Sequence, residues 1–209
     1  QAIPYAKPQE STIPVSGGAG SSMPDGLTLK GSSWFWHPFA KDGSQRPPDL
    51  CYFRRTHEIA ANRKVARAGF LLTADTHFTL YVNGKEVGHD SGAPDAWKER
   101  PMIDFSKALK AGKNTLAIEA QKDGGPTLAA GIVGMYKIEF TGGPPLEGRI
   151  YESWLASTVG EGAWSDPEFK DEGWKKTQKV VGYGEPPWGD LENVKVQVEE
   201  TDAPDYKFT

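Results

Sequence analysis

The sequence has little cysteine, no long apolar run and no excess of positive charge, and each shortage excludes a class of protein. Among 209 residues there is one cysteine, Cys51, so no disulfide can form within the chain. The apolar runs are far shorter than the roughly 20 residues that a membrane-spanning helix needs. The net charge of −4 argues against nucleic acid, because phosphate binding needs a basic face. We expect no disulfide framework, no membrane insertion and no nucleic-acid partner.

Short enzyme motifs are also missing. The chain contains no G-x-S-x-G, no H-E-x-x-H and no C-x-x-C, and its four histidines are scattered without the spacing of a zinc site. Glycoside hydrolysis needs two carboxylates about 5 to 9.5 Å apart in a cleft. With 28 acidic residues some such pair can always be chosen, so the number of acidic residues is not evidence for glycoside hydrolysis. We predict that the chain is not an enzyme. A catalytic fragment would require two convergent acids in a deep pocket.

What the sequence does contain is glycine, proline and aromatic residues between short alternating segments. Gly (24), Pro (16) and Trp (7) are all frequent, and no segment keeps helical periodicity over three turns. Alternation and β-branched or aromatic content predict strands at 51–59, 65–75, 78–84, 102–105, 114–121 and 131–140. Residues 106–113 read as one helical turn ended by Gly112. Strands separated by turns every 8 to 12 residues indicate an all-β sandwich.

The most secure local prediction is a hairpin around Asn83-Gly84. This pair stands between "TLYV" and "KEVG", and a type I′ turn needs positive φ at both central residues. Cys51 lies in a strand-like segment and is expected to be a small buried apolar residue rather than a nucleophile.

The chain divides into four parts by composition. Residues 1–28 hold four prolines and a Gly/Ser cluster, which is typical of a linker or a segment laid across a surface. We expect one β-sandwich at 29–142, an aromatic C-terminal extension at 143–198 that completes it, and an acidic tail at 199–209. The opening Gln1 and its Ala/Pro-rich surroundings suit a trimmed exported protein, and an arbitrary boundary would look the same.

Four phrases occur in an order that resembles a known family. "SSWFWHP" is followed by "CYFRRTHEI", then by "ARAGFLLTADTHFTLYVNGKEVG" and by "WKERPMIDFSKALKAGKNTLAIEA". This series resembles the galactose-binding-like jelly-roll modules attached to bacterial α-L-rhamnosidases and to other large exported proteins. The resemblance covers residues 32–140 and is more specific for fold than for function. It implies a jelly-roll β-sandwich, with the catalytic acids of such rhamnosidases in a separate helical barrel.

A later phrase, "FKDEGWKK" at 169–176, is similar to the F-x-D-x-x-W that starts sugar-binding sandwich modules in glycosidases. No complete second module follows it, so either the sequence stops inside one or this segment completes the first sandwich, which we favour. The resemblance further implies a secreted, periplasmic or cell-surface location and attachment to other domains.

Carbohydrate is the partner that these features favour. A non-catalytic sugar site needs an exposed aromatic ring beside polar side chains, because a sugar presents C–H faces ringed by hydroxyls. Aromatic residues in loops are the candidates, and the Asp90–Arg100 loop is the predicted ligand site. The residues selected on this basis are Trp97, Asp95, Arg100, Trp188, Tyr183 and His77. Trp97 and Trp188 could instead pack beneath their loops, and Asp75 reads as a turn-stabilising acceptor. The alternative function is a structural spacer module without a ligand.

A structural calcium ion is a further hypothesis. The resemblance implies that sandwiches of this kind often hold Ca²⁺ in a loop of carboxylates and carbonyls. The stretch "GHDSGAPDAW" offers Asp90 and Asp95 as oxygen ligands on one loop. Two acids five residues apart are also common by chance.

Overall fold

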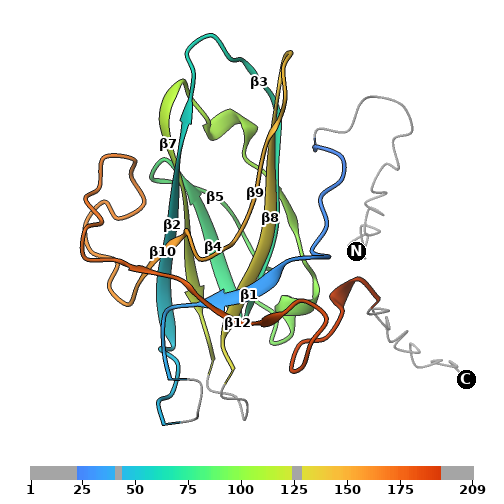
Figure 1. Ribbon diagram of the computed structural model, residues 1–209, viewed down its shortest axis with the longest axis vertical. Coiled ribbons are helices and arrows are strands. Elements are labelled where there is room, and N and C mark those ends of the chain that lie inside the picture. The colour runs from blue at the N-terminus through green and yellow to red at the C-terminus, as the bar shows by residue number, and fades with distance from the viewer. Residues whose placement is uncertain (1–22, 41–43, 124–128, 194–209) are drawn as a thin grey trace, which may run out of the picture.

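In the part of the chain that the structure describes, the strands form two antiparallel sheets of six strands each, which stand side by side in Figure 1. The computed structural model describes residues 23–40, 44–123 and 129–193. Sheet A has the order β12 (Gln178–Gly182), β1 (Ser33–Trp36), β8 (Gly131–Phe140), β3 (Val65–Asp75) and β6 (Met102–Asp104), and β9 (Leu146–Arg149) also pairs with β8. Sheet B has the order β11 (Lys175–Lys176), β10 (Leu155–Ser157), β2 (Leu50–Ile59), β7 (Gly112–Gln121), β4 (His77–Val82) and β5 (Lys85–His89). The predicted jelly-roll β-sandwich is confirmed.

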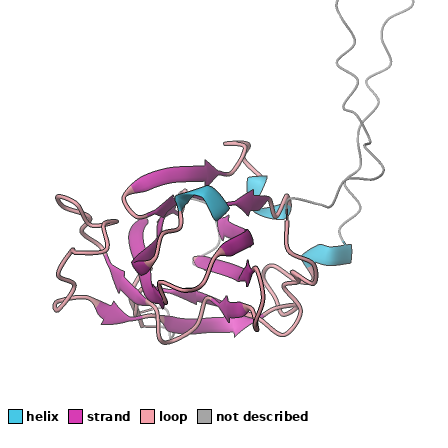
Figure 2. Ribbon diagram, turned by 90° about the horizontal axis from the view of Figure 1, so that it is seen from above, coloured by secondary structure: helices cyan, strands magenta, loops and turns pink. Residues whose placement is uncertain are grey.

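Helical structure among the described residues is limited to short 3₁₀ turns, as Figure 2 shows from above. These are η1 (Ala96–Lys98), η2 (Ser106–Ala108) and η3 (Leu191–Asn193). The helical turn expected over 106–113 ends earlier than predicted, at Ala108, and Gly112 with φ of 83° opens β7 instead. None of the helical turns in this part of the chain is long and apolar enough to span a membrane.

The main core lies between the sheets and is made by every second residue of the long strands. On β2 the apolar residues of this face are Cys51, Phe53 and Ile59, and on β3 they include Phe70 and Leu72. Each fully buried apolar side chain of this size contributes about 1.5–3 kcal/mol. Burial raises the pKa of the Cys51 thiol to about 12, so the thiol stays protonated. Cys51 is a buried apolar residue, as predicted.

A second apolar cluster covers the outer face of sheet A. Trp34, Leu71 and Val133 each alternate with a neighbour that faces the main core, so they point to the opposite side of the sheet. The cluster is completed by Leu29 before β1 and by Trp188 and Leu191 from the C-terminal extension. Segments from both ends of the described chain therefore close this face.

Residues after position 143 share both sheets with residues before it. Strands β9 and β12 join sheet A, and β10 and β11 join sheet B. In Figure 1 the chain crosses in front of the sandwich from β9 to β10 and so passes from one sheet to the other. Before β1, the Met23 carbonyl accepts a hydrogen bond of 3.1 Å from the Arg67 side chain. Residues 1–22 and the predicted tail at 199–209 lie outside the described residues.

The predicted hairpin is present, and its tip is a contact point for the C-terminal extension. Asn83 and Gly84 have φ of 54° and 79°, the two positive values that the turn requires. The Gly84 N–H donates to the Ser165 carbonyl at 3.0 Å, and a Cβ on Gly84 would collide with the carboxylate of Asp166. The hairpin tip therefore needs glycine for its backbone angle and for this close approach.

Candidate functional site

A groove of about 320 Å³ opens beside β4, β5 and β7 of sheet B, where β4 begins and β7 ends. We call it the histidine groove. Its polar side chains come from these three strands and the start of the following loop, and they are His77, Thr79, His89, Asp90, Ser91, Glu119 and Gln121. Strand alternation explains the set, because Thr79 lies opposite Glu119 and His77 lies opposite Gln121 in the ladder.

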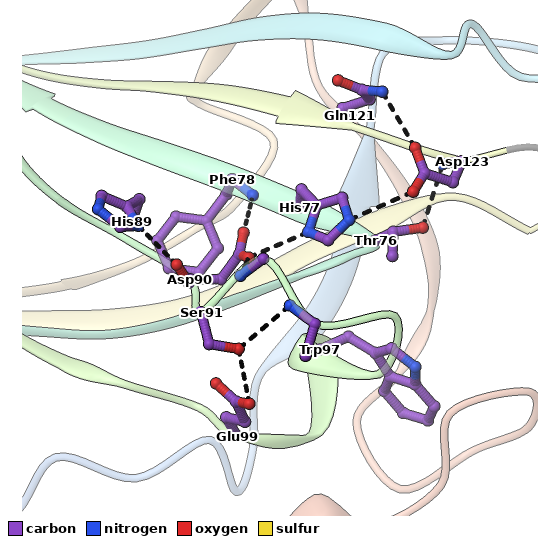
Figure 3. A network of polar contacts seen from close by, with 12 residues as sticks. Thr76, His77, Phe78, His89, Asp90, Ser91, Trp97, Glu99, Gln121 and Asp123 are labelled. Atoms are coloured by element: carbon purple, nitrogen blue, oxygen red, sulfur yellow. Dashed lines mark hydrogen bonds and ion pairs between the residues drawn. The ribbon is translucent and has the colours of Figure 1, made fainter.

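His77 is held between two carboxylates at one end of the groove (Figure 3). Its Nδ1 lies 3.0 Å from Asp90 Oδ1, and its Nε2 lies 3.2 Å from Asp123 Oδ2. Gln121 Nε2 donates to the other oxygen of Asp123 at 3.0 Å. The imidazole is therefore fixed from both sides, so its orientation is set before any ligand arrives.

Asp90 is the most constrained acid of the groove. It is 6% exposed, and its oxygens accept hydrogen bonds from the backbone N–H groups of Phe78 at 2.5 Å and Gly92 at 2.6 Å, in addition to the His77 contact. Burial acts to raise the pKa of Asp90, but these hydrogen bonds outweigh it and the pKa lies below its ordinary value. Asp90 is thus ionised at neutral pH and anchors the start of the loop that follows β5.

Glu119 differs from Asp90 because its carboxylate is not engaged. It is half-buried on β7, lines the groove, and makes no hydrogen bond or ion pair among the described residues. Burial and then the charge of Glu119 raise the pKa values of Tyr52 and Tyr81, which places this carboxylate close to both phenols. Among the described residues of the groove, Glu119 is therefore a carboxylate acceptor that has no hydrogen-bond or ion-pair partner.

Behind this end of the groove, Thr76 is hydrogen-bonded to the segment after β7 and Asp75 to the C-terminal extension. The Asp123 N–H donates to Thr76 Oγ1 at 3.1 Å, and Asp75 Oδ2 accepts a hydrogen bond of 2.9 Å from the indole N–H of Trp188. Within its own turn, Asp75 Oδ1 accepts a hydrogen bond of 3.4 Å from Thr76 Oγ1, in line with the turn-stabilising role that the sequence predicts. Its shorter hydrogen bond comes from an indole 113 residues away in sequence, a contact that no local pattern shows.

The two tryptophans selected from the sequence lie on the outer face of sheet A, away from the histidine groove. Trp188 is 6% exposed and stacks on Trp34 with ring centroids 4.1 Å apart, so its ring faces are used for packing. Trp97 is half-buried against the same cluster, with Lys98 Nζ 5.3 Å from its ring centroid. In Figure 3 Trp97 lies beside the network of polar contacts. Its side chain does not line the groove. Of the two, only Trp97 keeps part of its surface open.

The other predicted residues are also dispersed. The Tyr183 hydroxyl donates to Asp190 at 3.1 Å and accepts from the Glu192 N–H at 2.9 Å, both within the C-terminal extension. Asp95 is exposed and pairs with Lys98 at 3.4 Å. Arg100 has φ of 50° and a buried Nε without a hydrogen-bond partner. Of the six ligand candidates, the structure brings only His77 into the groove.

The calcium hypothesis for Asp90 and Asp95 remains a prediction. Asp90 already accepts three hydrogen bonds and Asp95 is turned to Lys98. In the described part of the chain, no three His, Cys, Asp or Glu side chains converge as metal ligands do. A calcium ion there would need backbone carbonyls for most of its six to eight oxygen ligands.

Sequence reasoning missed Glu119, Gln121, Asp123 and His89. Glu119 and Gln121 sit at alternate positions near the end of a strand whose intervening residues, Ile118 and Ala120, are buried, so the signal was present in the alternation. Asp123 and His89 carry no local signal, because their positions depend on which strands become neighbours.

The chain is similar to parts of an α-L-rhamnosidase and of a lectin. No family model matches the chain. An α-L-rhamnosidase of Streptomyces avermitilis is 30% identical over 178 residues, which are 82% of this chain and 16% of that protein. The chain thus spans about a sixth of the length of this relative.

Comparison with solved structures also finds an α-L-rhamnosidase. The crystal structure of the Streptomyces avermitilis α-L-rhamnosidase complexed with L-rhamnose matches with a TM-score of 0.68 and 26% identity over 83% of this chain and 17% of that chain. A lectin from Pleurotus ostreatus in complex with GalNAc matches with a TM-score of 0.61 and 27% identity over 80% of this chain and 47% of that chain. In sequence and in fold, the chain is homologous to a β-sandwich module of α-L-rhamnosidases, the kind of module that its motifs resemble.

Proposed function

We propose that the chain is a non-catalytic carbohydrate-binding module, accessory to a larger exported protein, and that it binds sugar in the histidine groove. The observation that carries the proposal is the groove itself. It joins fixed imidazole groups, the unpaired carboxylate of Glu119 and the amide of Gln121 in a space of about 320 Å³. That volume lies within the range of about 300–1,000 Å³ typical of ligand pockets.

The chemistry of these groups suits hydroxyl recognition. Each sugar hydroxyl donates one hydrogen bond and accepts others, so it needs donors and acceptors side by side. Glu119 supplies an acceptor, Gln121 supplies both kinds of group, and the contacts with Asp90 and Asp123 keep His77 in place. No indole lines the histidine groove, so recognition there rests on hydrogen bonds rather than on stacking over tryptophan. Such a shallow site binds weakly, and its affinity rises when several modules act together.

The comparisons support a role with carbohydrate in the relatives' own terms. One matched structure is of a lectin in complex with GalNAc, and another is of a rhamnosidase complexed with L-rhamnose. A non-catalytic role is supported by the contacts of Asp90. Its carboxylate is buried and accepts hydrogen bonds from the Phe78 N–H, the Gly92 N–H and His77, so it is committed to holding the fold rather than free to act on a substrate.

The test is a glycan-array screen of the chain, with and without calcium, followed by calorimetry on the best sugar, with L-rhamnose and GalNAc included. Glu119→Gln removes the unpaired carboxylate and should weaken binding about tenfold, the effect of losing a hydrogen bond to a charged acceptor. Glu86→Gln makes the same change at an exposed position of β5 outside the groove and should leave affinity unchanged.

Two results would contradict the proposal. Equal effects of Glu119→Gln and Glu86→Gln would remove the histidine groove as the site. An absence of binding to any glycan in either calcium condition would favour the structural spacer module instead.

A further inference from the structure

A second and larger groove, of about 520 Å³, lies where the chain crosses from β9 of sheet A to β10 of sheet B. We call it the inter-sheet groove. The crossing segment is visible at the front of Figure 1. Its charged and aromatic lining includes Arg55, His57, Tyr136, Glu147, Arg149 and Tyr151, and it shares no residue with the histidine groove.

Arg55 and His57 occupy unusual positions for charged and polar residues. They belong to the face of β2 that also carries Cys51, Phe53 and Ile59, all of which are buried in the main core. Both are half-buried rather than enclosed, because the sandwich opens at this edge. Two polar residues in succession on a core face are costly unless they are hydrogen-bonded or reach a ligand.

The positive charge of Arg55 is not neutralised within the described part of the chain. Its Nη1 donates to the Ser153 carbonyl at 2.9 Å, and it forms no ion pair there. The one carboxylate in the wall, that of Glu147, is paired with Lys137 at 3.0 Å. A guanidinium presents several N–H groups in one plane and matches a carboxylate with two parallel hydrogen bonds. Arg149, the second arginine of the wall, donates from Nη1 to the Thr28 carbonyl and to Ser32 Oγ and forms no ion pair among the described residues. The groove therefore favours an anionic group with the geometry of a carboxylate.

His57 adds a fixed hydrogen-bond donor. Tyr136 Oη lies 2.8 Å from His57 Nε2, and burial raises the pKa of Tyr136 to about 12, so the phenol keeps its proton and donates it. Burial, followed by the charge of Arg55, lowers the pKa of His57 to about 4, so the imidazole is neutral at pH 7. With Nε2 as acceptor, the single ring proton is on Nδ1. Nδ1 has no partner among the described residues.

Tyr151 supplies the exposed aromatic ring that the histidine groove lacks. It is 58% exposed, lines the inter-sheet groove, and lies against the buried ring of Phe35 with centroids 5.8 Å apart. An exposed ring that is supported from below is suited to contact the C–H face of a sugar. Its neighbour Arg55 is charged, so the surface combines an apolar face with a cation.

We propose that the inter-sheet groove binds a saccharide residue that carries a carboxylate, that is, a uronic acid. Arg55 receives the carboxylate, Tyr151 contacts the ring face, and His57 Nδ1–H donates to a hydroxyl or ring oxygen. This site is separate from the histidine groove and is proposed for a charged rather than a neutral sugar. Either site can be present without the other.

The test is a titration of the ¹⁵N-labelled chain followed by amide chemical shifts. The probes are trigalacturonate, the neutral trisaccharide galactotriose, and sodium acetate as a carboxylate without a sugar. Trigalacturonate should shift the amides of 55–57 and 147–153 and bind about tenfold or more tightly than galactotriose and acetate, because only it satisfies both the cation and the ring face. Shifts in His77, Thr79 and Gln121 would report the histidine groove separately.

Variants then assign the contacts. Arg55→Gln should reduce the preference for trigalacturonate over galactotriose at least about fivefold, although Arg149 remains in the wall. Tyr151→Ala should weaken binding of trigalacturonate at least about fivefold, the loss of one aromatic contact. Arg46→Gln removes an exposed arginine outside the groove and should change neither value. The proposal is overturned if trigalacturonate leaves 55–57 and 147–153 unshifted, if acetate binds as tightly, or if Arg55→Gln and Arg46→Gln behave alike while both remain folded by their amide spectra.

Discussion

At the scale of single residues, Arg54 holds the C-terminal extension onto sheet B. Its side chain is 1% exposed and donates to the carbonyls of Trp164 at 3.0 Å and Asp166 at 3.2 Å. Asp171 lies 3.1 Å from its Nε as an ion-pair partner, although the angle is too poor for a hydrogen bond. Phe169 flanks the guanidinium at 5.1 Å. A buried charge of this kind is costly alone and stable only with these partners.

Arg54→Met should therefore destabilise the protein strongly. The variant keeps much of the side-chain volume but loses two hydrogen bonds to buried carbonyls and leaves Asp171 without its cation. We expect a loss of about 2–4 kcal/mol in the free energy of unfolding, measured with urea. This is somewhat less than for a fully buried ion pair, because Asp171 is partly exposed and water can hydrate it in the variant. Arg46→Met, at an exposed arginine, should cost less than about 0.5 kcal/mol. Similar losses in both variants would contradict a clamping role for Arg54.

At the scale of elements, the strands follow from the sequence while the candidate site does not. The strands expected at 65–75 and 131–140 have those bounds in the structure, because alternation between a core face and an outer face is a local property. Trp188 was selected as an exposed ring, but Trp34, 154 residues earlier in the chain, covers it. The exposure of a loop aromatic is decided by such distant partners, which local pattern cannot supply.

The hairpin between β4 and β5 gives a prediction that separates backbone geometry from docking. Gly84 and Gly92 have similar positive φ, 79° and 75°, but a Cβ on Gly84 meets Asp166 whereas a Cβ on Gly92 meets nothing within 4 Å. Gly92→Ala should cost about 1–2 kcal/mol from the left-handed backbone alone. Gly84→Ala should cost at least about 1 kcal/mol more, since overpacking adds to the same strain. Asp166→Ala should remove that excess in the double variant, as measured by urea unfolding. Equal costs at the two glycines would mean that the hairpin tip does not depend on this contact.

At the scale of the whole molecule, a partly buried polar contact joins the two sheets. Tyr136 belongs to β8 of sheet A and His57 to β2 of sheet B, and their hydrogen bond of 2.8 Å crosses the sandwich beside the main core. The neighbouring rings of Phe70 and Trp154 enclose Tyr136. Burial lowers the pKa of His57 to about 4, so the folded protein contains this imidazole in its neutral form at neutral pH.

This depressed pKa makes the stability of the sandwich sensitive to mild acid. The unfolded chain binds a proton at His57 near its ordinary pKa of about 6.5, whereas the folded protein does so only near 4, so the stabilisation is present above pH 6.5 and is lost as pH falls toward 4. Between pH 7 and pH 5 the loss from this residue should be about 1–2 kcal/mol in the free energy of unfolding.

His57→Gln is the variant that isolates this effect, because glutamine does not titrate and can still accept a hydrogen bond from Tyr136. Burial also lowers the pKa of His37, so both proteins should lose some stability in this range. Asp90 and Glu192 have lowered pKa values, so the stability that they provide is lost only below about pH 4.5. They therefore add little to the difference in stability between pH 7 and pH 5. Urea unfolding at pH 7 and pH 5 should therefore show a smaller loss for His57→Gln than for the parent chain. An equal loss in the two proteins would show that the folded protein does not hold His57 as a neutral group between the sheets.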